Sequence, residues 1–509
     1  MAYTLSSIEV FLLFSTLCVS IGNAAEKRNV LIILADDYGF ENQVYNNSVC
    51  KTPNIDKLAQ QSVIFKYGYT AVSSCSPSRS SILTGLPQHQ NGHYGLAHGY
   101  HHFQAFDNVK SLPLILKDHN IRTGLIGKKH VHPDTVFKFD YERTEENNQM
   151  YQVARNITHM KALVNEFLHA NDSRPFLLYI GFNDPHRCTA DAERGAFCEM
   201  FGNGQPGKGI IKDWKPVYYK PEEVIVPFFI QDTPAAREDI AKQYTTISRM
   251  DQGIGLFMKE LEDAGFADNT LVIFTSDNGI PFPNAKTTLY EKGMGEPFMV
   301  SSPLHRQRWG QESNDMVSTL DIVPTVLDWY NIKYPSYKMF NIDVKLTGKS
   351  LLPSLQLEQG WDTVHASHDF HEVTMAYPMR VIRHKNYRLI HNLNNRIPYP
   401  IASDIALSET MQDIINRTMA QQPTHWFKTL RQYYYRDEYE MFDIVKDPKE
   451  LNNLAKDPQQ ATLFAELKTK LSQWQWETAD PWRCYPEGIL LDMGYFASNQ
   501  SCMSLANEL

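Results

Sequence analysis

The run from Cys75 to Gly85 (CSPSRSSILTG) places a sulfur and a guanidinium one helical turn apart. Pro77 suits the first turn of a helix, because the N–H that proline lacks would have no partner there. Cys75 then stands at or just before a helix N-terminus, where partial positive charge gathers, and Arg79 follows on the same face. This arrangement suits nucleophilic chemistry on an anion. For a lone cysteine, a buried structural role is the ordinary alternative.

Oxygen-bearing side chains follow two apolar runs that are far apart in the sequence. Asp36 and Asp37 end the first run, and Asp277 and Asn278 end the second. Carboxylates gathered without a cation repel one another, and a divalent cation relieves that repulsion. Oxygen ligands without clustered His or Cys favour Ca²⁺ or Mg²⁺ over zinc. A helix cap or a turn is the alternative for an isolated Asp-Asp pair.

Basic side chains follow two further apolar runs. Lys128 and His130 come directly after Gly127, and His186 follows Asp184-Pro185. Close to a bound cation, Lys128 could hold the oxygens of an anion and His186 could protonate a leaving group. In isolation each would be read as a solvated charge or a structural histidine.

The four apolar runs predict the strands that bring these groups together. They are 29–34, 122–126, 176–182 and 271–275, and helical patterns at 52–61, 111–117, 157–169 and 237–264 separate them. Continuous apolar strands alternating with helices predict an α/β fold, with a mostly parallel sheet sandwiched by helices. Ligands bind such sheets at the carboxyl ends of the strands, which is where all four polar endings fall.

The sequence texture changes after residue 375. Short strands are expected at 379–383, 387–390 and 439–443, followed by an amphipathic helix at 463–475. This pattern predicts a smaller C-terminal α+β domain with an antiparallel sheet. We therefore expect a catalytic domain over 26–375 and a second domain over 376–509.

The N-terminus resembles a targeting segment. An apolar run at 10–19 precedes the small residues at 22–25, which predicts a signal peptide over 1–25. The run lacks a preceding Lys or Arg, so a signal anchor is the alternative. No later stretch is typical of a transmembrane helix. Five sequons are permissive for glycosylation, at Asn46, Asn156, Asn171, Asn416 and Asn499.

The chain has seven cysteines, and their distribution is compatible with secretion. Cys188 with Cys198, and Cys484 with Cys502, are the candidate disulfide pairs, although spacing alone does not fix connectivity. Cys50 is then expected to be a free thiol.

The overall charge argues against nucleic acid as a partner. The formal net charge is −9, and the sequence shows no stripe of Lys and Arg. Protonation of the 18 histidines in acid would reverse the sign of this charge. An acidic substrate is therefore compatible with an acidic compartment.

These motifs together resemble the sulfatase family of the alkaline phosphatase superfamily. The order LADD, CSPSRSSILTG, GKKH, DPH and TSDNG matches the family pattern, and the resemblance runs from about residue 29 to the C-terminus. Further segments, including GLPQHQNG, MDQG and HEVTM, resemble its sulfamidase branch. Most sulfatases have Trp where this chain has Lys129. Sulfamidases have Arg near the position that Lys286 occupies in this chain. Lys286 can also bind sulfate, but its ammonium group cannot make the two parallel hydrogen bonds of a guanidinium.

The resemblance implies a mechanism that the residues alone do not establish. Cys75 would be converted to formylglycine, whose hydrate attacks sulfur with one hydroxyl and expels sulfate through the other. Arg79 and one Ca²⁺ would stabilise charge, His130 would hold the aldehyde hydrate, and His186 would protonate the departing amine. The implied metal ligands are Asp36, Asp37, modified Cys75, Asp277 and Asn278, and the implied catalytic residues are Cys75, Arg79, Lys128, His130, His186 and Lys286.

The resemblance also implies a substrate, partners and a compartment. The expected reaction is hydrolysis of the N-linked sulfate of terminal N-sulfoglucosamine in heparan sulfate. The expected partners are that oligosaccharide, the formylglycine-generating enzyme and a second copy of the chain in a homodimer. Neither nucleic acid nor a membrane is expected as a partner. The expected compartment is the lysosome. Candidates for the sugar pocket are His101, His102, His368, Glu372 and Arg380. The alternatives are an O-sulfatase acting on a glycosaminoglycan sugar and a non-enzymatic glycan-binding relative.

Overall fold

The structure is a computed structural model that describes residues 28–189 and 193–505. The signal peptide expected over 1–25 lies outside these residues. An eight-stranded sheet forms the centre, in the order β4-β3-β5-β1-β6-β7-β2-β8. The bounds in that order are Tyr141–Thr144, Arg122–Gly127, Phe176–Gly181, Asn29–Ala35, Thr270–Ser276, Gly295–Ser301, Val63–Tyr69 and Glu312–Ser318.

The four predicted strands occupy the middle of this sheet. β3, β5, β1 and β6 are adjacent and parallel, and β4 continues the parallel set at one edge. β7 is antiparallel to both of its neighbours, and β2 and β8 run parallel to each other. The predicted α/β class with a mostly parallel sheet is confirmed.

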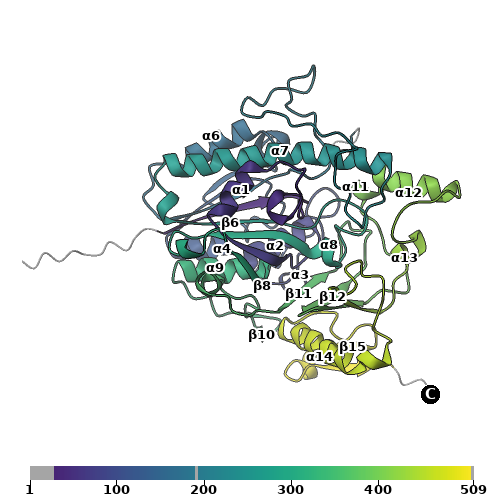
Figure 1. Cartoon of the computed structure of the whole chain (residues 1–509). Coiled ribbons are helices and arrows are strands. Elements are labelled where there is room, and N and C mark those ends of the chain that lie inside the picture. The colour runs from purple at the N-terminus through teal and green to yellow at the C-terminus, as the bar shows by residue number, and fades with distance from the viewer. Residues whose placement is uncertain (1–27, 190–192, 506–509) are drawn as a thin grey trace, which may run out of the picture.

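Helices cover both faces of the central sheet (Figure 1). Alternate residues of β1 point to opposite faces: Leu31 and Ile33 belong to one hydrophobic cluster, and Val30 and Ile32 to the other. The first cluster includes α1 (Pro53–Gln60), α6 (Ile157–Leu168) and α7 (Pro234–Asp263). The second includes α2 (Cys75–Thr84), α4 (Leu112–Asp118) and α9 (Ile322–Trp329). This burial explains why the strands are continuous apolar runs.

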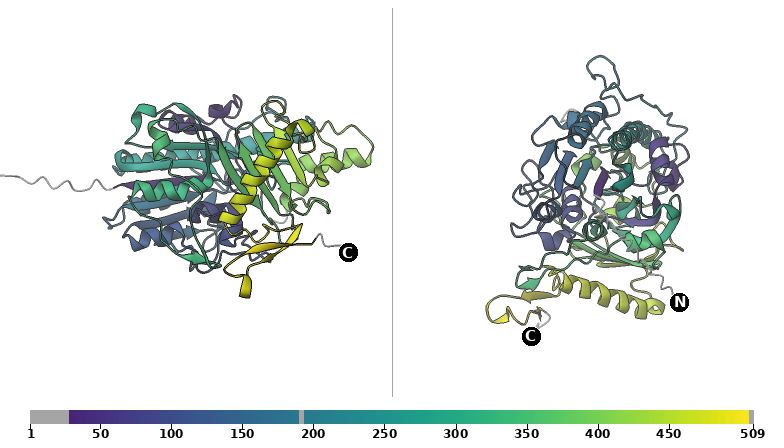
Figure 2. Two further views of the ribbon diagram at one scale, coloured as in Figure 1. Left: turned by 90° about the horizontal axis from the view of Figure 1, so that it is seen from below. Right: turned by 90° about the vertical axis from the view of Figure 1, so that its left-hand side faces the viewer.

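A second, antiparallel sheet lies beside the first. It has the order β11-β12-β13-β14, with bounds Thr363–His368, Met379–His384, Tyr387–Asn392 and Tyr439–Asp443. Helix α14 (Ala461–Glu477) lies diagonally across its outer face (Figure 2), where Leu467 and Trp474 pack against Ile382 and Met441. The predicted helix and strands are confirmed. β11 joins this sheet although it precedes residue 375, so the division between 26–375 and 376–509 stays a proposal.

Short elements complete the described chain. The strands β15 (Gly488–Leu491) and β16 (Ser501–Ser504) pair with each other, and the disulfide Cys484–Cys502 links β16 to the segment before β15. The remaining helices are α3 (Gln88–Asn91), α5 (Met150–Ala154), α8 (Glu291–Met294), α10 (Leu352–Gln356), α11 (Ser403–Ala406), α12 (Glu409–Met419) and α13 (Leu430–Tyr434). The remaining strands are β9 (Lys338–Met339) and β10 (Ile342–Asp343). The 3₁₀ turns lie at Gln43–Tyr45, Ala267–Asn269, Arg306–Arg308, Thr319–Asp321, Pro458–Gln460 and Gly494–Phe496. In the described ranges no helix is both long enough and apolar enough to cross a bilayer.

Candidate active site

The carboxyl ends of β1 and β6 bring the predicted oxygen ligands together. These neighbouring strands pair up to Ala35 and Ser276, so the residues that follow them meet at one edge. The backbone N–H of Asp37 donates to Asp277 Oδ1 at 3.1 Å, and Asn278 Nδ2 donates to Asp37 Oδ1 at 2.6 Å. Asp36, Asp37, Asp277 and Asn278 are all fully buried. The prediction that these four residues meet at one edge of the sheet is confirmed.

Helix α2 starts at Cys75 and delivers Arg79 to this acidic group. Cys75 Sγ lies 3.9 Å from Asp37 Oδ1. Arg79 Nε and Nη2 lie 2.9 and 2.8 Å from Asp277 Oδ2, and Nη2 lies 3.4 Å from Asp36 Oδ1. Burial raises the pKa of the Cys75 thiol well above its ordinary value, although Lys128 and Lys286 oppose this effect. The unmodified thiol is therefore a poor source of thiolate.

The turn after β3 directs Lys128 into the site. Gly127 has a φ of +99°, and a Cβ at this position would lie 2.0 Å from the carbonyl oxygen of Gly181. Only glycine fits this close approach between strands. Lys128 Nζ donates to Asp36 Oδ2 at 2.6 Å. Lys129 is buried elsewhere, with its Nζ 2.6 Å from Asp134 Oδ1.

Lys286, His186 and Asp404 form a connected group next to Asp37 Oδ2. Lys286 Nζ lies 2.8 Å from Asp37 Oδ2, 3.1 Å from His186 Nε2 and 3.0 Å from Asp404 Oδ2. His186 Nδ1 lies 2.7 Å from the carbonyl oxygen of Arg187, which can only accept, so Nδ1 carries a proton. Nε2 is then the ring nitrogen whose protonation can change. Burial, and then the charge of Lys286, lowers the pKa of His186.

A divalent cation fits the donor set that the structure provides. Asp36 Oδ1 and Asn278 Oδ1 are buried and lack a hydrogen-bond partner among the described residues. Asp36, Asp37, Cys75 and His186 each offer an atom within 4.8 Å of the others. The carboxylate and amide oxygens among these donors suit a hard cation.

Charge supports the same conclusion. Four carboxylates (Asp36, Asp37, Asp277 and Asp404) contact three fixed cations (Arg79, Lys128 and Lys286), which leaves one net negative charge. Burial and the adjacent Asp36 raise the pKa of Asp277. A bound divalent cation would relieve this crowding and make the group net positive, as binding of an anion requires.

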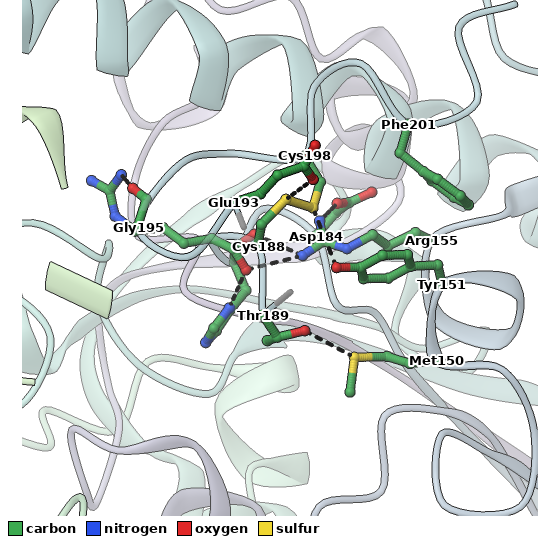
Figure 3. The surroundings of a disulfide bond; sticks show 12 residues. Met150, Tyr151, Arg155, Asp184, Cys188, Thr189, Glu193, Gly195, Cys198 and Phe201 are labelled. Carbon is green, nitrogen blue, oxygen red and sulfur yellow. Dashed lines mark hydrogen bonds and ion pairs between the residues drawn. A yellow bond between two sulfur atoms is a disulfide. The ribbon is translucent and has the colours of Figure 1, made fainter. Parts of the chain in front are cut away.

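A disulfide anchors the chain shortly after His186. Cys188 and Cys198 are bonded, as predicted, and Figure 3 shows Arg155 and Asp184 packed beside them. Arg155 pairs with Asp184 and donates to the carbonyl oxygen of His186 at 2.8 Å. The backbone at His186 and the nearby Cys188 are thus held, which positions His186. Among the described residues, Cys50 is an unpaired buried thiol, as expected.

A cavity of 260 Å³ opens onto the site. Of the five sugar-pocket candidates, His101 and Glu372 line it. His102 is exposed outside it, and His368 is buried away from it. Arg380 is also excluded, because its guanidinium is buried between Asp369 and Asp480, at 2.8 and 2.6 Å. The expectations for His102, His368 and Arg380 are corrected accordingly.

Several residues at the site were not found from the sequence. Asp404, His98 and His371 line the cavity, and Glu296 is a buried carboxyl on β7 whose pKa is raised by burial and by Asp277. His371 belongs to the HEVTM segment but was not singled out there, and the other three belong to no motif. The position of Asp404 at the start of the short helix α11 resembles an ordinary helix start, so no sequence signal distinguished it.

The predicted glycosylation sites differ in accessibility. Asn46, Asn171, Asn416 and Asn499 are exposed. Asn156 is half-buried, and its side chain caps α6 by accepting from the N–H of His159 and also donates to Gln152 Oε1 at 2.6 Å. Four of the five sequons are therefore accessible to a glycan.

Comparison with known proteins identifies the family. The sulfatase family model matches residues 28–332, which include every strand end described above. This chain belongs to the sulfatase family. Residues 410–477 also match the model described as N-sulphoglucosamine sulphohydrolase, C-terminal.

Individual relatives agree with this assignment. This chain is 55% identical over 487 residues to N-sulphoglucosamine sulphohydrolase of Homo sapiens. The alignment covers 95% of this chain and 96% of that protein. It is 23% identical to N-acetylglucosamine-6-O-sulfatase of Bacteroides thetaiotaomicron, with 90% and 88% covered. A solved structure in complex with its substrate D-glucosamine-2-N,6-O-disulfate has a TM-score of 0.62 at 20% identity, with 89% of this chain and 98% of that chain covered. That likeness concerns the fold.

Proposed function

We propose that this sulfatase hydrolyses the N-linked sulfate of terminal N-sulfoglucosamine in heparan sulfate. The observation that carries the proposal is the 55% identity with human N-sulphoglucosamine sulphohydrolase across 95% of the chain. The identity spans both the strand-end site and the C-terminal region that supplies Asp404 to the cavity. The chemistry of the site, an acidic group with fixed cations beside it, is that expected for a transferring sulfate.

Two groups would complete the site. Cys75 as formylglycine would supply a hydrate hydroxyl as nucleophile, and Ca²⁺ would supply charge stabilisation at the sulfate oxygens. Asp36, Asp37, Asp277 and Asn278, together with the modified residue at position 75, would hold the Ca²⁺. Calcium is proposed over zinc because most of these donors are oxygens.

The lysines and Arg79 would bind the anionic part of the substrate. In the structure Lys128 and Lys286 neutralise Asp36 and Asp37 at 2.6 and 2.8 Å. If a divalent cation were bound to those carboxylates, both ammonium groups would be available to sulfate oxygens. Arg79 stays bound to Asp277 and adds positive charge that needs no reorganisation during the reaction.

His186 would protonate the departing nitrogen. Its Nδ1–H is fixed on the carbonyl oxygen of Arg187, so the transferable proton belongs on Nε2. Nε2 lies 3.8 Å from Asp404 Oδ2, and this carboxylate would stabilise the imidazolium. An amine leaves poorly as an anion, so proton transfer from His186 is needed for cleavage of the sulfur–nitrogen bond. His130, whose buried Nδ1 lacks a hydrogen-bond partner among the described residues, would orient the nucleophile.

The cavity size suggests action at a chain end. Pockets for drug-sized ligands measure about 300–1,000 Å³, and this one measures 260 Å³. It would therefore accept one sugar with its sulfate, lined by His101 and Glu372, and exclude the interior of a polysaccharide.

We further propose a secretory and lysosomal route. The signal peptide over 1–25, conversion of Cys75 by the formylglycine-generating enzyme, glycosylation at the exposed sequons and homodimer formation all belong to this proposal. The two disulfides support an oxidising compartment. Glycosidase treatment of the secreted protein and light scattering would test the glycans and the dimer.

The experiment that tests the reaction combines two measurements on one secreted preparation. Mass spectrometry of the Cys75 peptide should give the mass of the aldehyde, and incubation with N-sulfoglucosamine should release sulfate and free amine in equal amounts. An unmodified thiol in every active preparation would overturn the role of Cys75. Aldehyde without any release from this sugar would overturn the substrate assignment.

A further inference from the structure

Two histidines and a carboxylate form a group apart from the acidic centre, and one of them, His98, lines the active-site cavity. His98 follows α3, His132 follows β3, and Glu146 follows β4. One ligand atom from each lies within 4.8 Å of the other two. None of these residues belongs to the motifs that identify the family, and the proposed hydrolysis does not use them.

We propose that His98, His132 and Glu146 form a binding site for a divalent transition metal, with Zn²⁺ as the preferred ion. Imidazole nitrogen and carboxylate oxygen are ordinary zinc ligands, and three protein ligands with one open position are typical of accessible zinc sites. The donor type differs from that of the oxygen-rich centre, so the two sites would select different cations.

Two of the three distances between the ligand atoms are close to those around a bound zinc ion. His98 Nε2 and His132 Nε2 lie 3.7 and 3.6 Å from Glu146 Oε1. Ligands held at 2.0–2.1 Å around a tetrahedral ion are separated by about 3.4 Å. Small side-chain rotations would therefore bring the three atoms onto one ion. Their side chains are 36%, 33% and 20% exposed, so an ion and a water ligand can reach them.

Surrounding charges favour a cation at this place. Lys129 Nζ lies 4.0 Å from Glu146 Oε2, but it is already engaged by Asp134 at 2.6 Å and Glu142 at 3.4 Å. The buried carboxyl of Glu145 is close enough to His98 for that ring to affect its pKa. Carboxylates thus outnumber lysines around the group.

The site would be coupled to the cavity through one ring contact. His98 stacks on His130 with ring centroids 4.1 Å apart and planes inclined by 15°. Both rings line the cavity. A metal on His98 would fix this wall in one position.

Zinc binding can be tested without any reference to catalysis. The secreted full chain would be kept in excess Ca²⁺, which fills the oxygen-rich centre, at about pH 7.5, where free imidazole is mostly neutral. Zn²⁺ would be titrated by calorimetry, and Co²⁺ would be added to a second sample for its visible spectrum. The variants are His98→Gln, His132→Ala and Glu146→Gln. His159→Ala, at an exposed histidine outside the group, is the matched control.

We expect one Zn²⁺ per chain in the wild type and in His159→Ala, and at least about tenfold weaker binding in each of the three variants. The Co²⁺ spectrum should show the intense bands of low coordination in the wild type and lose them in His132→Ala. Absence of Zn²⁺ binding, or binding that survives all three substitutions, would overturn the proposal and leave the group as histidine–carboxylate ion pairs. Thermal unfolding of each variant distinguishes a lost site from a lost fold.

Discussion

Lys286 donates to Asp404 Oδ2 across 3.0 Å and so connects the loop after β6 to helix α11, 118 residues further along the chain. Both side chains are buried. The contact brings a carboxylate from beyond the antiparallel strand β13 into a site otherwise built at the carboxyl ends of the central strands. Asp404 also lies 3.8 Å from His186 Nε2, so one carboxylate faces both the lysine and the histidine.

Asp404→Asn should slow the reaction by changing the charge around Lys286 and His186. Lys286 keeps Asp37 as a partner, so we expect a loss of about 1–2 kcal/mol, or roughly tenfold, in kcat/KM rather than the full cost of an unpaired buried charge. If Asp404 stabilises the imidazolium of His186, the pH profile of kcat should shift as well. Steady-state kinetics across pH would measure both effects.

Asp413→Asn is the control for this variant, because Asp413 lies on the neighbouring helix α12 and pairs with Arg417 at 2.9 Å outside the cavity. Its kinetics should match those of the wild type. If Asp404→Asn also behaves as the wild type, the proposed positioning role of Asp404 is wrong.

Arg380 should matter for stability rather than for sugar binding. Its guanidinium is fully buried between Asp369 and Asp480, and Arg380→Ala would leave two carboxylates without their partner. Removing one member of a buried ion pair costs about 3–5 kcal/mol. Urea unfolding should show this loss, whereas Arg306→Ala, which breaks an exposed pair with Asp268, should change the free energy of unfolding little. A raised KM with unchanged stability would restore Arg380 to the sugar pocket.

Buried histidines should make the fold less stable in mild acid. Burial lowers the pKa of His89 to about 3, while its Nδ1 and Nε2 contact Ser367 and Thr478 at 3.0 and 2.7 Å. The unfolded chain takes up a proton near pH 6.5 and the native chain does not, so stability present at neutral pH is lost progressively as pH falls from about 6.5 towards 3.

This contribution can be isolated in one variant. At pH 5 the free energy of unfolding is lower by about 2 kcal/mol through His89. This value follows because pH 5 lies about 1.5 units below the pKa of an unfolded histidine, and each unit corresponds to about 1.36 kcal/mol. His89→Gln removes the titration, so its free energy of unfolding should fall about 2 kcal/mol less than that of the wild type between pH 7.5 and 5.0. Urea unfolding at the two pH values measures the difference. Identical pH slopes in the two proteins would show that His89 is protonated in the native state.

Much of the site could be predicted because its residues directly follow apolar strands. β1, β3, β5 and β6 are buried on both faces, so their sequences are continuous apolar runs and their ends are visible. β2 and β8 escaped prediction because they carry exposed residues such as Lys66 and Glu312, which interrupt the apolar run.

The remaining errors concern contacts between distant segments. Asp404 reaches the site through tertiary packing, and nothing adjacent to it in the sequence indicates this. The sequence makes Arg380 a candidate for the sugar pocket, but Asp480, 100 residues away, binds it in the interior. Charge type alone therefore could not separate a pocket arginine from a structural one.

Calcium should stabilise the fold through the strand-end carboxylates. A ligand at 100 times its Kd adds about 2.7 kcal/mol to the free energy of unfolding. Chelation should therefore lower Tm and abolish sulfate release, and added Ca²⁺ should restore both. Asp277→Asn replaces one carboxylate of the group by a neutral amide and so removes a negative charge, and its Tm should respond much less to Ca²⁺. An equal Ca²⁺ response in this variant would place the cation elsewhere.

The most direct test of the account compares two sulfated ends on the same enzyme. Heparan fragments that end in N-sulfated or in 6-O-sulfated glucosamine would be incubated at about pH 5, where free imidazole is largely protonated, with the wild type and with Cys75→Ser. The account predicts sulfate release from the N-sulfated end alone, and its loss in the variant. Release from the 6-O-sulfated end instead would contradict the proposed substrate, and undiminished release by Cys75→Ser would contradict the nucleophile.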